Sequence, residues 1–256
     1  MKKRLENKVI VVAGAGTALE GLGNGKAAAV QFAREGAKVL CADLVETAAQ
    51  ATAKMIKEEG GEAIACAGNI LKADDIQNII DTCLNQYGRI DVLHNNVGIP
   101  GGGEIVDVDE ETWDRTFAIN VKGMFLTCKM MIPHMIKNGG GCIINVSSIA
   151  SHRPLPSAAY VSSKGAVDSL TRYIAVRYGR YNIRANVLLL GYIDTPLARP
   201  AWEIEKIKQI NLRQVPLRRF ASPWEVATVA AFLASDDASY INGVILPVDG
   251  GLVTNL

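Results

Sequence analysis

The chain has 256 residues, of which 49% are hydrophobic and 21% charged, a composition that excludes disordered, collagen-like and fibrous proteins. The 27 lysines and arginines balance 26 acidic residues, and no basic stripe is present that could follow a nucleic-acid backbone. No stretch approaches the roughly 18 apolar residues of a membrane span. We therefore expect one domain, residues 1–256, with neither nucleic acid nor membrane as a partner.

The cysteines and histidines show no spacing typical of metal ligands. Five cysteines are widely spaced with no C-x-x-C pair, and the three histidines form no cluster. We expect reduced core thiols, a cytoplasmic location and no metal site.

Short β-branched runs alternate with longer amphipathic segments along the whole chain. This alternation predicts an α/β fold, in which helices cover both faces of a mostly parallel, doubly wound sheet. The seven predicted strands are residues 8–13, 38–42, 62–67, 92–95, 142–146, 184–190 and 244–248. The predicted helices lie near residues 25–36, 47–59, 72–87, 110–137, 158–181 and 223–233.

The least regular stretch is residues 194–215, which contains two prolines and then a charged segment. Irregular segments beside strand ends commonly close over ligands, so we expect a mobile lid here. Residues 100–103 and 151–157 are expected to line the same pocket. His152 and Arg153 could recognise an anionic group or could be ordinary solvated loop residues.

Five glycines, from Gly14 to Gly25, separate the first predicted strand from the first helix. Backbone N–H groups in such a turn can approach a pyrophosphate, which the positive end of the helix favours. The spacing is not a strict G-x-G-x-x-G, so a turn that is merely tight stays open as an alternative.

Asp43 ends the second strand, 20 residues after Gly23. A carboxylate at this place accepts hydrogen bonds from the adenosine ribose hydroxyls, and its charge would repel a 2′-phosphate. The pattern favours NAD over NADP, with a simple strand-ending aspartate as the alternative.

Tyr160 and Lys164 are four residues apart in a predicted helix, which puts the phenol and the ammonium on one face. A nearby cation stabilises a phenolate, so the pair becomes a usable acid and base. Ser148 ends the fifth strand twelve residues before Tyr160, at the edge of an open sheet where ligands bind.

Along essentially its whole length the chain resembles the short-chain dehydrogenase/reductase family. The matching motifs come in the family's order, which makes the resemblance specific. They are Asn95-Asn96-Val97-Gly98, like the family's NNAG; Asn120 within Asn120-Val121-Lys122-Gly123; the triad Ser148, Tyr160 and Lys164; Asn69-Ile70, which corresponds to the adenine contact; 191–196, which corresponds to the segment that holds the nicotinamide carboxamide; and 247–251.

This resemblance implies a Rossmann-type fold and an NAD-dependent enzyme that interconverts a secondary alcohol and a ketone, as a homotetramer. Tyr160 would exchange the hydroxyl proton, Ser148 would bind the substrate oxygen, Lys164 would orient the ribose and lower the pKa of Tyr160, and Asn120 would support Lys164 through a water. The expected cofactor-binding residues are Gly14, Gly16, Gly23, Asn24, Gly25, Asp43, Asn69, Ile70, Asn96, Gly98, Tyr160, Lys164, Ile193 and Thr195. Apolar stripes in the helices around Met124 and Val167 agree with oligomerisation, or with burial against the chain's own sheet.

The glycine-rich turn departs from the family's TGxxxGxG by a five-residue insertion, with Ala13 in place of threonine. From the length of the following helix we expect Gly23 and Gly25, and not Gly16 and Gly21, to be the close-approach glycines. The region from Thr17 to Gly21 should then bulge outward. Other departures are Val97, Asn69, Leu190 and Ala221, which replace alanine, aspartate, proline and glycine.

Two other functions stay open. The enlarged turn makes a non-catalytic dinucleotide-binding scaffold conceivable, although the four catalytic positions are intact. An epimerase or dehydratase that uses transient oxidation is the second alternative. The sequence does not specify the alcohol.

Overall fold

Seven parallel strands form one sheet in the order β3-β2-β1-β4-β5-β6-β7. This computed structural model describes residues 3–17, 21–153, 155–199 and 204–254. The order reverses direction between β1 and β4, so the predicted doubly wound α/β fold is confirmed. The strands are β1 (Val9–Ala13), β2 (Lys38–Asp43), β3 (Glu62–Ala67), β4 (Val92–Asn95), β5 (Gly141–Ser148), β6 (Ile183–Leu190) and β7 (Ile245–Val248).

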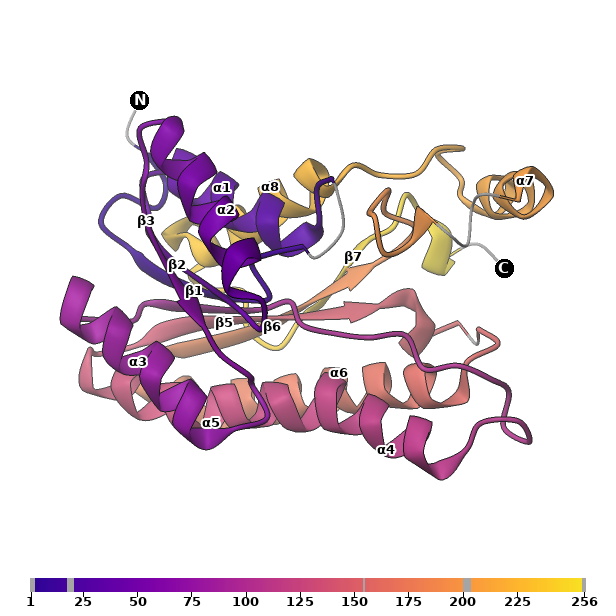
Figure 1. Cartoon of the computed structure of the whole chain (residues 1–256), viewed down its shortest axis with the longest axis horizontal. Helices are drawn as coiled ribbons and strands as arrows, with labels where there is room; N and C mark the ends of the chain where they lie inside the picture. The colour runs from indigo at the N-terminus through magenta and orange to yellow at the C-terminus, as the bar shows by residue number, and fades with distance from the viewer. Residues whose placement is uncertain (1–2, 18–20, 154, 200–203, 255–256) are drawn as a thin grey trace.

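Helices cover both faces of the sheet (Figure 1). One face carries α1 (Asn24–Arg34), α2 (Glu46–Glu58) and α8 (Pro223–Ala234), and the other carries α3 (Ala73–Tyr87), α4 (Glu110–Phe117), α5 (Gly123–Lys137) and α6 (Ala158–Tyr178). Strand side chains alternate between the two apolar cores, because successive residues point to opposite faces. In β1, Ile10 and Val12 pack with Phe32 of α1, whereas Val9 and Val11 pack on the other face.

The predicted helix over 110–137 is built from three pieces. A π-helical turn, Ala118–Lys122, separates α4 from α5. Such turns occur frequently at functional sites, and this one contains Asn120. The spacing of apolar residues does not distinguish it from a continuous α-helix.

The predicted lid, residues 194–215, is more regular than expected. Its second half forms α7 (Glu205–Gln214), which has no buried residue and lies beyond the end of the sheet (Figure 1). The expectation of an irregular segment is therefore wrong for this half. Residues 200–203 lie outside the described residues, as do residues 18–20 of the predicted bulge.

A buried layer of polar side chains joins the centre of the sheet to two helices. Asn95 of β4 donates to the Asn145 side chain of β5 at 2.9 Å, and Asn145 donates to the Thr171 hydroxyl of α6 at 2.9 Å. The Thr127 hydroxyl of α5 donates to Asn95, also at 2.9 Å. All four side chains are buried, and because they satisfy one another they avoid the cost of unpaired polar groups.

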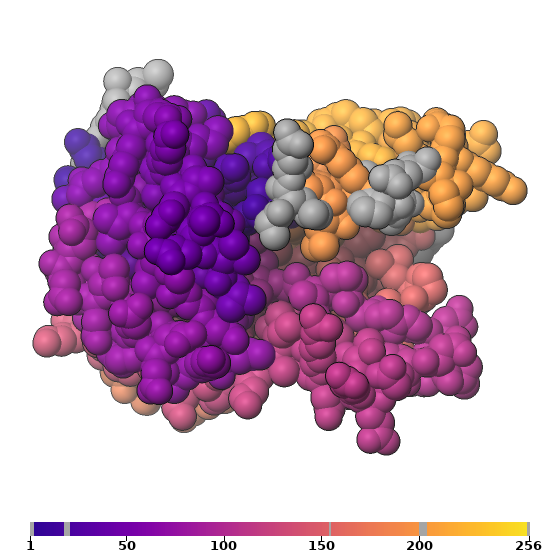
Figure 2. Space-filling view, in the orientation of Figure 1, coloured from indigo at the N-terminus to yellow at the C-terminus, as the bar shows by residue number. Residues whose placement is uncertain are grey.

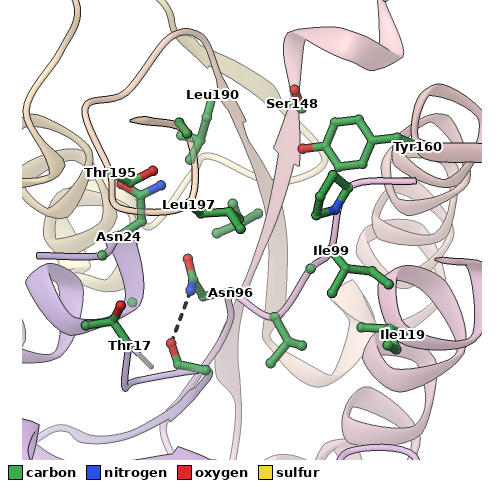
Figure 3. A pocket seen from close by; sticks show the side chains of 18 of the residues that line it. Thr17, Asn24, Asn96, Ile99, Ile119, Ser148, Tyr160, Leu190, Thr195 and Leu197 are labelled. Carbon is green, nitrogen blue, oxygen red and sulfur yellow. Dashed lines mark hydrogen bonds between the residues drawn. The ribbon is translucent and has the colours of Figure 1, made fainter. Parts of the chain in front are cut away.

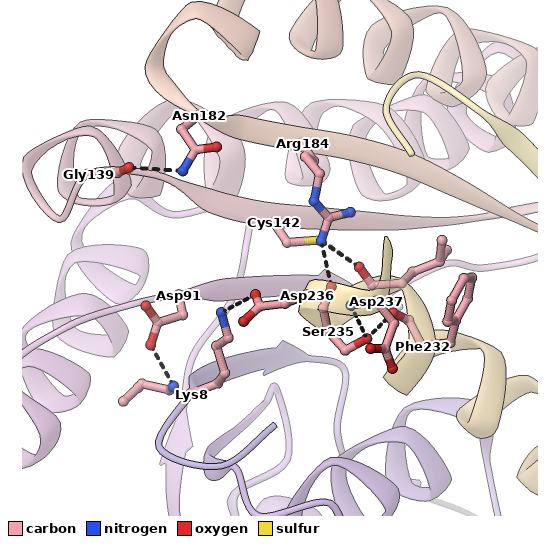
Figure 4. Close-up of polar contacts among 12 residues, drawn as sticks. Lys8, Asp91, Gly139, Cys142, Asn182, Arg184, Phe232, Ser235, Asp236 and Asp237 are labelled. Atoms are coloured by element: carbon pink, nitrogen blue, oxygen red, sulfur yellow. Dashed lines mark hydrogen bonds and ion pairs between the residues drawn. The ribbon is translucent and has the colours of Figure 1, made fainter. Parts of the chain in front are cut away.

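The amino-terminal edge of the sheet is held by Arg184 of β6 (Figure 4). Its guanidinium donates to the carbonyls of Leu233, Ser235 and Ile241, at 2.8, 3.2 and 3.3 Å. The Leu233 and Ser235 carbonyls lie at the end of α8, where the last carbonyls of a helix lack partners within the helix. A cation there also suits the negative end of the helix dipole.

All five cysteine thiols are free and buried. Burial raises the pKa of Cys41, Cys83 and Cys128 to about 12, so these thiols are poor nucleophiles. In the described ranges, none of the helices combines the length and apolar character needed to span a membrane.

Candidate active site

A cavity of about 840 Å³ lies at the carboxyl ends of the strands. The space-filling view shows a hollow between the orange residues that follow β6 and the magenta residues around α4 (Figure 2). Segments that follow β1, β2, β4, β5 and β6 all contribute to its wall. This is where open α/β sheets bind ligands.

The glycine-rich turn forms one end of the cavity. Gly23 is the N-cap of α1, so the helix begins where the proposed insertion places it. A side chain on Gly25 would overlap the Gly14 carbonyl oxygen, to which the Asn96 amide donates at 3.1 Å (Figure 3). At Gly23 the nearest atom to an added Cβ, on Thr17, is 3.7 Å away, so that position opens toward the cavity.

Gly16 was expected not to be a close-approach glycine, and this expectation is wrong. An added Cβ there would lie 2.6 Å from the Cβ of Ala48 in α2 and 3.0 Å from the Asp43 carboxyl carbon. Gly16 is therefore a close-approach glycine of helix packing. Gly21 has φ +123°, which favours glycine, and an added Cβ would lie 3.0 Å from Pro196.

Asp43 lies at the cavity wall with its carboxylate fixed by backbone groups. It accepts from the N–H of Gly16 at 2.9 Å and from that of Val45 at 3.0 Å. A carboxylate offers about four acceptor positions, so this one keeps capacity for two hydroxyls. The geometry fits the ribose of an adenine nucleotide.

Ser148 and Tyr160 meet at the opposite end of the cavity. Ser148 is the last residue of β5 and Tyr160 lies in the first turn of α6, with their hydroxyls facing each other (Figure 3). Burial raises the pKa of Tyr160, and the hydrogen bond with Ser148 partly opposes this effect. The neighbouring Ser147 hydroxyl points away and donates to the Lys164 carbonyl at 3.3 Å.

Lys164 lies one turn after Tyr160 and is 3% exposed. Its Nζ donates to the Val146 carbonyl at 3.0 Å and lies 5.6 Å from the centre of the Tyr160 ring. Burial lowers the pKa of Lys164 to about 8, and the negative charge of Asp168 opposes the fall. Gly98 leaves room for this ammonium, since an added Cβ would lie 3.1 Å from Nζ.

Among the predicted catalytic and cofactor-binding residues, Asn120 alone does not line the cavity. Its Oδ1 accepts from the Ile99 N–H at 2.8 Å, and its Nδ2 donates to the Ile99 carbonyl and to Ser163 Oγ, both at 3.0 Å. The buried amide thus holds the segment after β4 against α6. The structure brings together around this one cavity all the other predicted catalytic and cofactor-binding residues, namely Gly14, Gly16, Gly23, Asn24, Gly25, Asp43, Asn69, Ile70, Asn96, Gly98, Ser148, Tyr160, Lys164, Ile193 and Thr195.

Several wall residues were missed by the sequence reasoning. Arg115 and Ile119 reach the cavity from α4 and the π-helical turn, and Leu44 reaches it from the loop after β2. The apolar spacing of the predicted helix over 110–137 does not single out either of the first two. His152 and Arg153 do not line the cavity, and Arg153 donates to the Leu252 carbonyl at 2.9 Å.

Comparison with known proteins agrees with this geometry. A family model described as enoyl-(acyl carrier protein) reductase matches residues 18–253. The 3-oxoacyl-(acyl-carrier-protein) reductase of Thermotoga maritima is 38% identical over 251 residues, which cover 98% of this chain and 99% of that protein.

A Burkholderia xenovorans crystal structure assigned to the short-chain dehydrogenase/reductases has a TM-score of 0.95 and 32% identity, covering 99% of both chains. A 7α-hydroxysteroid dehydrogenase in complex with NADH has a TM-score of 0.91 and 34% identity, covering 98% of this chain and 96% of that chain. The chain is an oxidoreductase that belongs to the short-chain dehydrogenase/reductase family.

Proposed function

We propose that the protein interconverts a secondary alcohol and a ketone with NAD as cofactor. The observation that carries this proposal is one continuous cavity, lined by Asp43 and the glycine-rich turn at one end and by Ser148, Tyr160 and Lys164 at the other. The bound nicotinamide supplies the hydride chemistry, and the protein supplies binding and orientation.

Tyr160 is the proposed acid and base. Burial alone raises the pKa of its phenol, so its phenolate needs a nearby positive charge. Lys164 can supply one, since its Nζ lies 5.6 Å from the centre of the Tyr160 ring. Ser148 donates to the substrate oxygen and stabilises the charge that develops there in the transition state.

Asn120 is proposed to act by holding neighbouring residues of the cavity wall in place. Its side chain bonds Ile99 and Ser163, so it fixes the wall beside Lys164. A carboxamide oxygen can accept two hydrogen bonds, so Oδ1 keeps one acceptor position for the water that would link Asn120 to Lys164.

NAD is preferred over NADP in this proposal because of Asp43. Its carboxylate is held in place by two N–H groups, and no lysine or arginine follows it immediately in the sequence. A 2′-phosphate at this position would face an unbalanced negative charge.

A homotetramer in the cytoplasm is proposed as the working form. Met124, Val167 and Ile174 are buried within the chain, whereas Phe125, Tyr173 and Val176 of α5 and α6 are exposed. Exposed apolar side chains on neighbouring helices suit a subunit interface, and unpaired buried thiols suit a reducing compartment. Light scattering that shows a monomer at micromolar concentration would reject the oligomer.

The test of the function is NAD⁺ reduction, followed by absorbance, over a panel of secondary alcohols that includes sugars, steroids, hydroxy acids and cyclic alcohols. We expect turnover of at least one class and production of the ketone. Tight NADH binding with no turnover across the panel would contradict the proposal and favour the non-catalytic scaffold.

A further inference from the structure

A buried carboxylate lies one helical turn beyond Lys164. The Asp168 side chain is 6% exposed, and its Oδ1 has no hydrogen-bond partner in the described parts of the chain. A buried charge without partners is costly. A nearby cation or hydrogen-bond donor therefore has a strong effect on the energy of the Asp168 carboxylate.

The group that faces Asp168 comes from the segment after β5. His152 Nδ1 lies 3.7 Å from Asp168 Oδ2, which is too long for a hydrogen bond but close enough for the polar imidazole ring to attract the carboxylate. The side chain of His152 is 39% exposed, so its other ring nitrogen can reach solvent.

Two contacts of Ser151 connect His152 and Asp168 to Ser148. Ser151 Oγ donates its one hydrogen to the Ser148 carbonyl at 2.9 Å. It also lies 2.9 Å from His152 Nδ1, so at that contact the histidine must be the donor. A chain of contacts thus runs from Asp168 to the His152 ring at 3.7 Å, and from the His152 Nδ1–H through the Ser151 hydroxyl to the Ser148 carbonyl.

The contacts of Ser151 and His152 lie in the segment that sets the direction of the Ser148 hydroxyl. The short 3₁₀ turn Ile149–Ser151 follows Ser148 directly, and the Ala150 N–H donates to Ser148 Oγ at 3.2 Å. The His152 and Arg153 N–H groups both donate to the Ile149 carbonyl. A displacement of this turn relative to α6 would change the direction of Ser148 relative to Tyr160.

We propose that Asp168 and His152 form a positioning pair that holds the turn after β5 against α6 and so sets the geometry between Ser148 and Tyr160. Neither residue touches the substrate in this proposal. It rests on the proposed function, since it concerns the same reaction. Asp168 also adds a negative charge near Lys164, which favours the charged ammonium.

The test uses Asp168→Asn, which keeps the shape and removes the charge, and His152→Leu, which removes the donor. We expect kcat to fall about tenfold in each, since small misplacements of reacting groups are costly, while the Kd for NADH stays within about twofold. Backbone amides of residues 149–153 should exchange with deuterium faster, while those of β1 should not change.

Two further variants separate this pair from a general structural role. His152→Asn can keep a donor near the place of Nδ1 and should recover most of the lost kcat. The double variant of Asp168→Asn and His152→Leu should lose no more than either single variant, because the two residues act through one contact. Asp81→Asn removes the same charge from an exposed site on α3 and serves as the control.

The outcomes are distinguishable. Unchanged kcat and unchanged exchange in Asp168→Asn, or losses that multiply in the double variant, would overturn the positioning pair. A wild type that binds NADH but turns over no alcohol would overturn the proposed function, and the exchange measurement would still decide on the pair. If Asp168→Asn does not fold, the half-exposed His152 provides the same test through its two variants.

Discussion

His94 of β4 is completely buried, and among the described residues neither of its ring nitrogens has a hydrogen-bond partner. It pairs in register with Val12 and Ile144, and its ring meets that of Phe32 edge-on at 5.5 Å. This apolar environment lowers the pKa of His94 from 6.5 to about 4. The native protein therefore holds His94 neutral under conditions in which the unfolded chain protonates it.

The sign of the effect follows from proton binding. Between pH 6.5 and 4 the unfolded state binds the extra proton, so the free energy of unfolding falls as the pH falls. Each pH unit in that window costs about 1.4 kcal/mol, so His94 removes about 2 kcal/mol at pH 5 and about 3 kcal/mol at pH 4. Above pH 6.5 this loss is absent.

His94→Leu should remove the pH-dependent loss and also the two unpaired nitrogens. Urea unfolding at fixed protein concentration should show that the stability of the variant relative to wild type increases by about 2 kcal/mol between pH 7.5 and pH 5. Ile144→Val is the control, since it changes the same core without a titrating group. An equal difference between His94→Leu and wild type at both pH values would refute the reasoning.

Four other predictions concern the cavity and the sheet edge. Tyr160→Phe should lower kcat by about 10² to 10⁴ with little change in the Kd for NADH, because only the proton-exchanging hydroxyl is lost; near-normal turnover would remove Tyr160 from its role. Asp43→Ala should narrow the preference for NAD over NADP in kcat/KM, and a wild type that prefers NADP would contradict the ribose assignment. Gly23→Val should weaken NADH binding with only a small loss of Tm, from the less favourable N-cap, whereas Gly25→Val should lower both strongly, since Gly25 has no space for a side chain. Arg184→Ala should lower the free energy of unfolding by about 2 kcal/mol in urea titrations, because carbonyls that the guanidinium satisfies lose their donor.

The strands and most residues of the cavity wall could be predicted because their signals are local. β-branched runs mark the strands, and the wall residues follow strand ends, where a parallel sheet gathers them at one edge. The helix start after Gly23 also follows from counting residues to β2. None of these inferences required knowledge of a distant contact.

The missed features depend on contacts between segments far apart in the sequence. Gly16 is tight only because Ala48 of α2 packs on it, and the pairing of Asp168 with His152 needs α6 and the turn after β5 side by side. α7 escaped prediction because a helix without a buried face gives a weak periodic signal. The side-chain contacts of Asn120 with Ile99 and Ser163 likewise exist only in the folded chain.

α6 presents Tyr160, Lys164, Asp168 and Thr171 on one face, and each adjacent pair is about one helical turn apart. An α-helix rotates by about 100° per residue, so a single insertion or deletion between Tyr160 and Thr171 would turn the ammonium away from the phenol or the helix away from Asn145. Loops that border the cavity carry no such constraint on length. In a lineage of such chains, new substrates are therefore expected to arise through changes in loop length, while the length of this helical segment stays constant.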